Sequence, residues 1–330
     1  MKDYGVSVLE QYEMEVFSTR RIRGAVLCDT DRGVFLLKET RVAKGRLPVL
    51  LSVYELLGEN GLELADAPLA NREGEYVSCA EDGTFYMVKR WFCGRECDIR
   101  REAELLEGVR LLANLHRILR FPGRSDAEAE KRESLKEEYE RHNRELRKVR
   151  SFVRKRSVKG EFETVFLQGF EKMYLPASLA AKRLEGEGIA QLYEEFQREG
   201  TFIHGDYNYH NLMICPQGMA VTGFERTHQD VQMADFYYFL RKTMEKYHYD
   251  ERLGYRMMRA YDDVLTLDRP KRDYLAVRLA YPEKFWKIVN MYYHSNKAWI
   301  PAKNVEKLRN SIAQSEEKRR FLENLFSFSI

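Results

Sequence analysis

The chain has 330 residues, of which 44% are hydrophobic and 12% aromatic. This composition predicts a packed globular protein and excludes a largely disordered chain. The net charge is only +3, from 55 basic and 52 acidic side chains. Such a balance excludes a strongly basic nucleic-acid binder, so no nucleic-acid partner is expected.

Two further features bound the cellular setting. The N-terminus has no apolar signal segment, and the longest charge-free stretch, residues 211–224, is shorter than the about 20 apolar residues that span a bilayer. Five scattered cysteines form no zinc-binding pattern and are expected to be reduced thiols. We therefore expect a soluble protein made in the cytoplasm, without a membrane span.

The first ninety residues alternate short apolar runs with turn residues, a pattern typical of a small sheet. Residues 24–28 and 34–38 predict a strand pair joined by a five-residue loop that contains glycine. Apolar residues recur at helical spacing over 48–57, and further strands are expected at 75–79 and 84–88. The pattern predicts a mostly antiparallel sheet with one helix.

Long helices are expected after residue 91. An apolar stripe runs through 105–119, and residues 126–158 are intensely charged, acidic at first and then basic. The change from strands to helices predicts an α+β protein with an N-terminal lobe at 1–91 and a larger, mainly helical lobe at 92–330.

The basic run within 126–158 has two interpretations. It could be a patch that binds a nucleic acid or another polyanion. The alternative, which we favour, is the solvated face of a helix whose buried stripe contains Leu146, Val149 and Val153.

Residues 202–213, Phe-Ile-His-Gly-Asp-Tyr-Asn-Tyr-His-Asn-Leu-Met, are the most informative segment of the chain. Asp206 and Asn211 are five positions apart, between two apolar segments. This is the spacing of a phosphotransferase catalytic loop, in which the Asp takes a hydroxyl proton and the Asn binds Mg²⁺ beside the ATP phosphates. Asp206 is therefore the candidate catalytic base and Asn211 a candidate metal ligand, with His204 expected to fasten the loop.

Phosphoryl transfer from ATP also requires a lysine on a strand and a helix glutamate that holds it. Lys38 ends an apolar strand, and Glu55 on the following helix is its expected partner. Gly24 is the only glycine in the hairpin segment Arg23-Gly24-Ala25, where a phosphate-covering loop carries several. Lys38, Glu55 and Gly24 are the candidate nucleotide-binding residues.

The segment after the catalytic loop departs from a working metal site. Gly223 stands where a kinase carries its second metal ligand, an aspartate. Were 220–225 a continuous strand, Glu225 would point to the same face as Gly223 and would be a candidate replacement ligand. Asp235 is expected to be the N-cap of a helix.

With these residues in view, the chain resembles the CotS-type spore coat proteins, which have the aminoglycoside phosphotransferase version of the protein-kinase-like fold. The resemblance covers nearly the whole chain. Besides His204-Gly205-Asp206 with Asn211, it rests on Trp91-Phe92-Cys93-Gly94-Arg95-Glu96, His142-Asn143-Arg144-Glu145-Leu146, Pro282-Glu283-Lys284-Phe285-Trp286 and the segment from Tyr293 to Trp299.

The resemblance implies a bilobal fold with ATP between the lobes and a place in the coat of a bacterial endospore, among other coat proteins. It makes Lys38 the phosphate lysine, Asp206 the base and Asn211 a metal ligand. The family usually has Asp-Phe-Asp or Asp-Phe-Glu where this chain has Gly223-Phe224-Glu225. The C-terminal aromatic residues would line an acceptor pocket or, as we favour, belong to the core of the helical lobe.

Two functions remain open. The first is a spore-coat-associated, kinase-like protein that is weak or inactive as a phosphotransferase because Gly223 replaces the metal-binding Asp. The second is an active ATP- and Mg²⁺-dependent phosphotransferase that acts on a hydroxyl of a small molecule. Intact Lys38, Asp206 and Asn211 favour the second function, and Gly223 with the glycine-poor hairpin favours the first.

Overall fold

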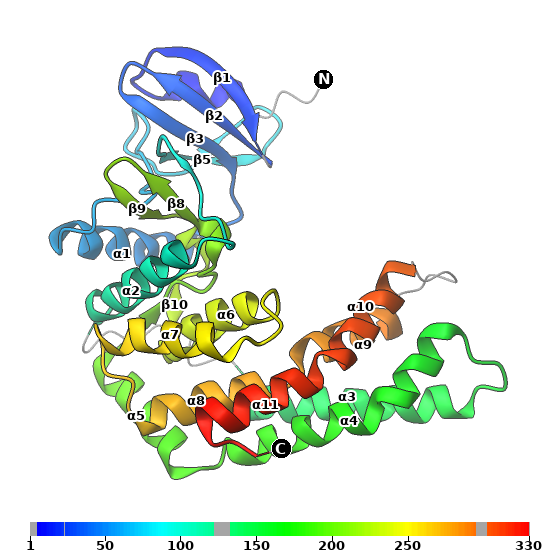
Figure 1. Ribbon diagram of the computed structural model, residues 1–330. Coiled ribbons are helices and arrows are strands. Elements are labelled where there is room, and N and C mark those ends of the chain that lie inside the picture. Colours follow the sequence, from blue (N-terminus) through cyan, green and yellow to red (C-terminus); the bar gives the residue numbers. More distant parts are fainter. Residues whose placement is uncertain (1–4, 23, 122–132, 295–301, 330) are drawn as a thin grey trace. The chain divides into compact units, whose positions relative to one another are not determined.

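The computed structural model describes residues 5–22, 24–121, 133–294 and 302–329 (Figure 1). The chain forms two compact units, each built from two segments. Unit 1 contains Met1–Leu119 and His204–Thr227, and unit 2 contains Arg120–Ile203 and His228–Ile330. The expected lobe division at residue 91 is a different one and stays a prediction.

The main sheet of unit 1 is antiparallel and has five strands in the order β1-β2-β3-β5-β4. The bounds are β1 Val16–Ile22, β2 Ala25–Thr30, β3 Gly33–Glu39, β4 Ser78–Cys79 and β5 Phe85–Arg90. The expected antiparallel sheet is therefore present. Strand β1 was not expected from the sequence, because its residues are mostly exposed and show no apolar alternation.

The hairpin between β2 and β3 is tighter than expected. Thr30 pairs with Gly33, so two residues rather than five form the connection. The Thr30 hydroxyl donates a hydrogen bond to the Gly33 carbonyl oxygen at 2.7 Å. The five-residue loop was wrong because polar Asp29 and Thr30, which look like turn residues, continue the strand pairing.

Strand alternation gives the sheet two different faces. One face carries Val26, Cys28, Phe35 and Leu37, which pack against residues 6–12 and against Tyr86 and Val88 of β5. The opposite face carries Ala25, Leu27, Leu36 and Lys38, which line a cavity. The cross-strand pairs Ala25–Lys38 and Leu27–Leu36 place these side chains next to one another.

Unit 1 also contains two helices and a second, smaller sheet. Helix α1 spans Leu47–Glu59 and buries a stripe that contains Leu50, Val53, Tyr54 and Leu57, and helix α2 spans Glu102–Ile118. A three-stranded antiparallel sheet has the order β6-β8-β9. Its strands are β6 Arg95–Glu96, β8 Leu212–Cys215 and β9 Gly218–Val221.

Unit 2 is mainly helical in its described part. A short antiparallel pair joins β7 Phe202–Ile203 to β10 His228–Gln229. The helices are α3 Leu135–Lys155, α4 Glu161–Arg183, α5 Glu187–Glu199, α6 Met233–Met244, α7 Glu251–Asp262, α8 Arg269–Ala280, α9 Glu283–His294, α10 Ala302–Ala313 and α11 Ser315–Phe326. Across the described residues, we find no helix that combines the length and the apolar composition needed to cross a membrane.

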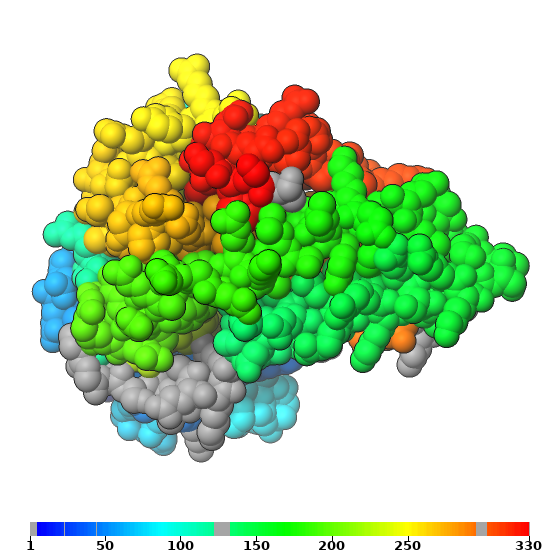
Figure 2. Space-filling model, turned by 90° about the horizontal axis from the view of Figure 1, so that it is seen from below, coloured from blue at the N-terminus to red at the C-terminus, as the bar shows by residue number. Residues whose placement is uncertain are grey.

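Most of the charged region 126–158 belongs to the long helix α3. Ser134 caps it, with Glu137 completing a capping box. Leu146, Val149 and Val153 are buried against α4, α9 and α10, as expected for a helix with one apolar stripe. Figure 2 shows the green surface of α3 and α4 beside the red and orange surface of the C-terminal helices. Residues 126–132 of the charged region lie outside the described residues.

The C-terminal aromatic residues mostly belong to this same core. Phe285 is fully buried, and Trp286 and Tyr292 pack on the core with part of their surface exposed. Tyr293 is 43% exposed, and Trp299 lies outside the described residues. For the first three, the expectation of a core position is confirmed.

Candidate functional site

The segment from His204 to Asn211 forms a loop between β7 and β8 that is held by its own side chains. His204 is fully buried, and its Nδ1 atom accepts a hydrogen bond from the Asp206 N–H at 3.2 Å. The other nitrogen, Nε2, therefore carries the proton and donates it to the Thr222 carbonyl oxygen at 3.0 Å. These two bonds fasten the loop to the end of β9, the role expected for His204.

Gly205 is required because two backbone segments meet at this loop. Its φ angle is +80°, and a Cβ atom built there would collide with the carbonyl oxygen of Arg226. The absence of a side chain at Gly205 lets the catalytic loop lie directly against the segment that follows β9.

Asp206 and Asn211 lie in one loop and are joined by a hydrogen bond, while their predicted roles as base and metal ligand stay predictions. The Asn211 Nδ2 group donates to the Asp206 carbonyl oxygen at 2.9 Å, which fixes the amide and directs its Oδ1 atom elsewhere. The Asp206 carboxylate accepts one hydrogen bond at Oδ1, from Asn208 Nδ2 at 3.1 Å. Both side chains line one cavity of about 510 Å³, together with Lys38, Gly223 and Glu225.

Lys38 lies near the end of β3, as expected, but its partner is not Glu55. Its Nζ atom is 3.4 Å from Glu225 Oε1. Glu55 is exposed on α1, because the buried stripe of that helix turns Tyr54 inward and the next residue outward. The expected Lys38–Glu55 ion pair is therefore wrong, and Glu225 takes the place of Glu55.

A second lysine, Lys89, contacts the same carboxylate oxygen as Lys38 and was not predicted from the sequence. Lys89 in β5 is 1% exposed, and its Nζ atom is 2.5 Å from Asp66 Oδ2 and 2.9 Å from Glu225 Oε1. Asp66 also accepts hydrogen bonds from the Tyr54 hydroxyl and the Gly223 N–H, both at 2.9 Å. The available signals were a lysine within the apolar strand 85–90 and a lone aspartate within the apolar segment 64–70.

Neighbouring charged side chains fix the protonation states of Lys89 and Glu225. Burial alone would lower the pKa of Lys89, but the carboxylates of Asp66 and Glu225 outweigh it and raise that pKa. Burial would raise the pKa of Glu225, but Lys89 and then Lys38 lower it to about 2. Lys89 is therefore a permanent cation and Glu225 a permanent anion at neutral pH.

The backbone at Gly223 decides how Glu225 lies relative to β9. Strand β9 ends at Val221, and Gly223 has the left-handed values φ +88° and ψ +41°. The next residues, Phe224–Arg226, form a 3₁₀ turn. Residues 220–225 therefore do not form a continuous strand, and the condition under which Glu225 would point to the same face as Gly223 is not met. Asp235 is also not an N-cap: α6 is capped by Gln232, and Asp235 lies in its first turn.

The fit of a metal ion can be tested on these side chains. Magnesium binds through oxygen atoms, mostly of carboxylates and water. Asn211 Oδ1 is available, but Gly223 offers no side chain and Glu225 is bound by two lysines. Among the described residues, no group of three or more His, Cys, Asp or Glu side chains has the arrangement of a metal site. The residues present therefore do not fit a magnesium site of the usual kind.

A larger, more apolar cavity of about 670 Å³ adjoins these residues within unit 1. Its walls are Leu27, Leu36, Trp91, Phe92 and Met213, and it shares Lys38, Asn211, Gly223 and Glu225 with the first cavity. Gly24 lies in the turn between β1 and β2, next to Ala25, which lines the larger cavity. An apolar slot that opens onto Lys38 and adjoins the cavity of Asp206 suits a flat heterocycle with attached phosphates.

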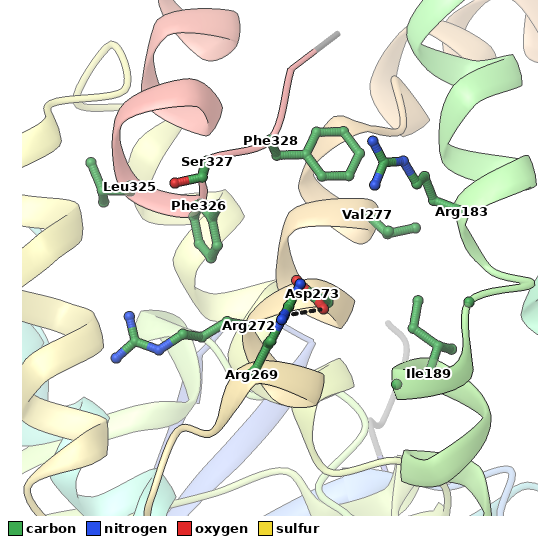
Figure 3. A pocket seen from close by; sticks show the side chains of 12 residues that line it. Arg183, Ile189, Arg269, Arg272, Asp273, Val277, Leu325, Phe326, Ser327 and Phe328 are labelled. Carbon is green, nitrogen blue, oxygen red and sulfur yellow. Dashed lines mark ion pairs between the residues drawn. The ribbon is translucent and has the colours of Figure 1, made fainter.

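Unit 2 has a cavity of the same volume, about 670 Å³, that contains none of the predicted site residues. Figure 3 shows Phe326 and Phe328 on one side, Ile189 and Val277 on another, and the ion pair between Arg269 and Asp273 at the bottom. The side chain of Arg269 is 92% exposed. We assign no chemistry to this cavity.

Comparisons with known proteins show the family of the chain and its fold. The family model described as "Spore coat putative kinase YutH" matches residues 6–325. No curated protein matches the sequence. An aminoglycoside phosphotransferase from Alicyclobacillus acidocaldarius aligns with a TM-score of 0.86 at 17% identity, over 97% of this chain and 94% of that one.

More distant structures share the fold. A spectinomycin phosphotransferase in complex with ADP and spectinomycin aligns with a TM-score of 0.59 at 10% identity, over 94% of this chain and 96% of that one. An amicoumacin kinase in complex with AMP-PNP and Ca²⁺ aligns with a TM-score of 0.58 at 13% identity, over 94% and 92%. The expected α+β kinase-like fold is confirmed, and so is the resemblance to kinase-like spore coat proteins.

Proposed function

Because the chain belongs to the family of spore coat putative kinases YutH, we propose that it is a coat-associated, kinase-like protein with weak or no phosphotransferase activity. One observation carries the proposal. The cleft of unit 1 combines Lys38, Asp206 and Asn211, but Gly223 stands at the second metal position and two lysines hold the neighbouring Glu225. Nucleotide binding is then retained while efficient transfer is lost.

An active phosphotransferase is the second candidate, and the position of Asp206 favours it. Its carboxylate lines the same cavity as Lys38. Within the part of the chain that the structure describes, its Oδ1 atom accepts a side-chain hydrogen bond from Asn208 and its Oδ2 atom accepts none. A positioned general base contributes about 10²–10⁴ in rate. The acceptor would be a hydroxyl of a small molecule, as for the phosphotransferases that share the fold.

A gain-of-function variant tests the proposal. Gly223→Asp supplies the missing carboxylate, and Asp tolerates the left-handed backbone better than most residues. The new Cβ would lie 3.3 Å from the Asn211 side chain, so that amide must shift slightly. We expect Mg²⁺-dependent consumption of ATP to increase at least about tenfold over the wild-type protein, a modest share of what a positioned ligand contributes.

Two controls interpret the result. Gly223→Ala places a Cβ atom at the same left-handed position without a carboxylate and should give no gain. Asp206→Asn within the Gly223→Asp variant should remove the gain, because the base is lost. High wild-type turnover that Asp206→Asn abolishes would support the active enzyme and overturn the proposal. Immunodetection of the protein in coat extracts of purified spores tests the coat assignment, and absence from that fraction contradicts it.

A further inference from the structure

Carboxylates in the cleft of unit 1 are already engaged by cations. Glu225 is bound by Lys38 and Lys89, and Asp66 is bound by Lys89 and the Gly223 N–H. Glu39, which lines the smaller cavity, is 3.7 Å from Arg41. Glu96, which lines the larger cavity, is 3.1 Å from His210. Among the carboxylates that line the smaller cavity, this leaves Asp206, the predicted base. A divalent cation would therefore have to displace a lysine to gain a second carboxylate ligand.

Displacing Lys89 is unfavourable. Its ammonium group is buried, so a metal ion at Glu225 would leave it with Asp66 alone and would add a second positive charge beside it. A buried ammonium group that loses one of its two carboxylate partners and gains a neighbouring cation is strongly disfavoured. The network therefore resists a divalent ion even though Asn211 Oδ1 remains available.

The same cavity is lined by four cationic side chains. These are Lys38, Arg41, Arg46 and Arg226, and the cavity also has the carboxylates of Glu39, Asp206 and Glu225 in its lining. Lys38 and Arg41 lie beside Glu225 and Glu39, but their side chains are 47% and 92% exposed, so a phosphate can reach them. Arg46 also donates to the Thr227 carbonyl oxygen. Guanidinium groups are planar, remain charged and bind phosphate oxygens in pairs. They can neutralise the phosphates of a nucleotide directly, which is the task that Mg²⁺ performs in most phosphotransferases.

We propose that this cleft binds a nucleoside di- or triphosphate without a divalent metal ion, with Lys38, Arg41, Arg46 and Arg226 supplying the neutralising charge. The inference rests on the proposed function, since it concerns the same cleft, and it adds how the ligand is held. The apolar cavity lined by Leu27, Leu36 and Trp91 would take the base, and the cationic cavity the phosphates. A cleft of this kind binds its nucleotide but lacks the metal that supports transfer.

Calorimetric titration of the full chain tests the proposal with adenosine, AMP, ADP and ATP, each in excess EDTA and in excess Mg²⁺. In EDTA, the affinity should rise with the number of phosphates, by at least about tenfold from AMP to ATP, which is the worth of one charge-assisted contact. Added Mg²⁺ should leave ATP binding unchanged or weaken it. Binding of ATP only with Mg²⁺, or equal affinity for adenosine and ATP, would overturn the proposal.

Two matched arginine variants test which side chains contact the nucleotide phosphates. Arg41 has a side chain that is 92% exposed, so Arg41→Gln should leave folding intact and weaken metal-free ATP binding by about fivefold while adenosine binding stays the same. Arg110→Gln removes an exposed arginine of α2 that does not line the cavity, and it should change neither. Unchanged ATP affinity in a variant that combines Arg41→Gln with Lys38→Met would also overturn the proposal.

The titrations in EDTA and in Mg²⁺ distinguish metal-free binding from nucleotide binding in general. Binding that requires Mg²⁺ would refute only the metal-free mode and would show that Asn211 and another oxygen ligand complete a metal site. An absence of nucleotide binding in both EDTA and Mg²⁺ would refute nucleotide binding by the cleft altogether.

Discussion

Two lysines, one in each unit, are both withdrawn from water but have different partners. Lys89 in unit 1 lies between the carboxylates of Asp66 and Glu225, and its pKa is raised. Lys318 in α11 of unit 2 is half-buried and donates to the carbonyl oxygens of Ala280 and Tyr281 at 3.2 and 3.1 Å. Burial lowers the pKa of Lys318 to about 7, in spite of the nearby Glu245.

The comparison shows that the carboxylates nearby, more than burial itself, set the charge of these lysines. Backbone carbonyls satisfy the hydrogen bonds of an ammonium group but do not neutralise its charge. Lys89 therefore keeps its proton under all physiological conditions and holds Glu225 in place, whereas Lys318 loses part of its charge near pH 7. Unit 1 uses a fixed cation at its cleft, and unit 2 contains a titratable one in its helical core.

Replacement of Lys89 should have the largest effect. Lys89→Met leaves Asp66 buried without a cation, so we expect the free energy of unfolding to fall by about 3–5 kcal/mol. Urea unfolding measures this change. The double variant Lys89→Met/Asp66→Asn should recover much of the loss, since no buried charge is left unpaired. A loss in Lys89→Met below about 1 kcal/mol, typical of an exposed ion pair, would contradict the buried network.

Acid should weaken the same network over a defined pH range. The pKa of Glu225 is about 2 in the folded chain and near 4.5 when exposed, so its stabilising effect is present above pH 4.5 and is lost as the pH falls towards 2. The difference corresponds to about 3 kcal/mol. Unfolding free energies of the wild-type protein and of Glu225→Gln should therefore converge on acidification. A constant difference between pH 5 and pH 2.5 would show that Glu225 is not held by the lysines.

Lys318 should make the free energy of unfolding depend on pH between about 7 and 10.5. The unfolded chain binds its proton up to about pH 10.5 and the folded chain only up to about pH 7, so stability should rise with pH between these values. A single group contributes at most about 1.4 kcal/mol per pH unit. Lys318→Met should remove this slope and should be as stable as the wild-type protein, or more stable, at pH 7. An unchanged slope in Lys318→Met would assign it to another group.

Replacement of Lys38 should have the smallest effect on stability. Its side chain is 47% exposed and its ion pair with Glu225 is 3.4 Å long, so Lys38→Met should cost less than about 1 kcal/mol. Lys89 continues to hold Glu225 in that variant. A loss as large as that in Lys89→Met would mean that the two lysines act as one unit, and a cycle of single and double variants would measure their coupling.

Much of the site was predictable because it is local in sequence. Asp206 and Asn211 lie five residues apart, and their loop was expected between two apolar segments, where β7 and β8 are found. Lys38 was found because it ends an apolar strand. Lys89 and Asp66 were missed because they are 23 residues apart, and neither is unusual until the fold pairs them.

The errors have a common physical origin. Glu55 was expected to hold Lys38, since the two are close in sequence and a helix follows the strand. Burial of Tyr54 and its neighbours turns Glu55 to the exposed face of α1. The carboxylate that contacts Lys38 is that of Glu225, 187 residues away in the chain. Whether 220–225 is a continuous strand was left open, because the left-handed backbone at Gly223 cannot be read from apolar residues alone.

The amino-acid sequence by itself determined the α+β class, the antiparallel hairpin, the buried stripe of α3 and the placing of the candidate residues Asp206 and Asn211 in one loop. These follow from periodicity and from short spacings, which depend on local backbone geometry. Tertiary structure alone decided which carboxylate meets which lysine and which face of the sheet lines the cleft. Those choices depend on contacts between segments far apart in the chain, where burial makes an unpaired charge too costly to leave alone.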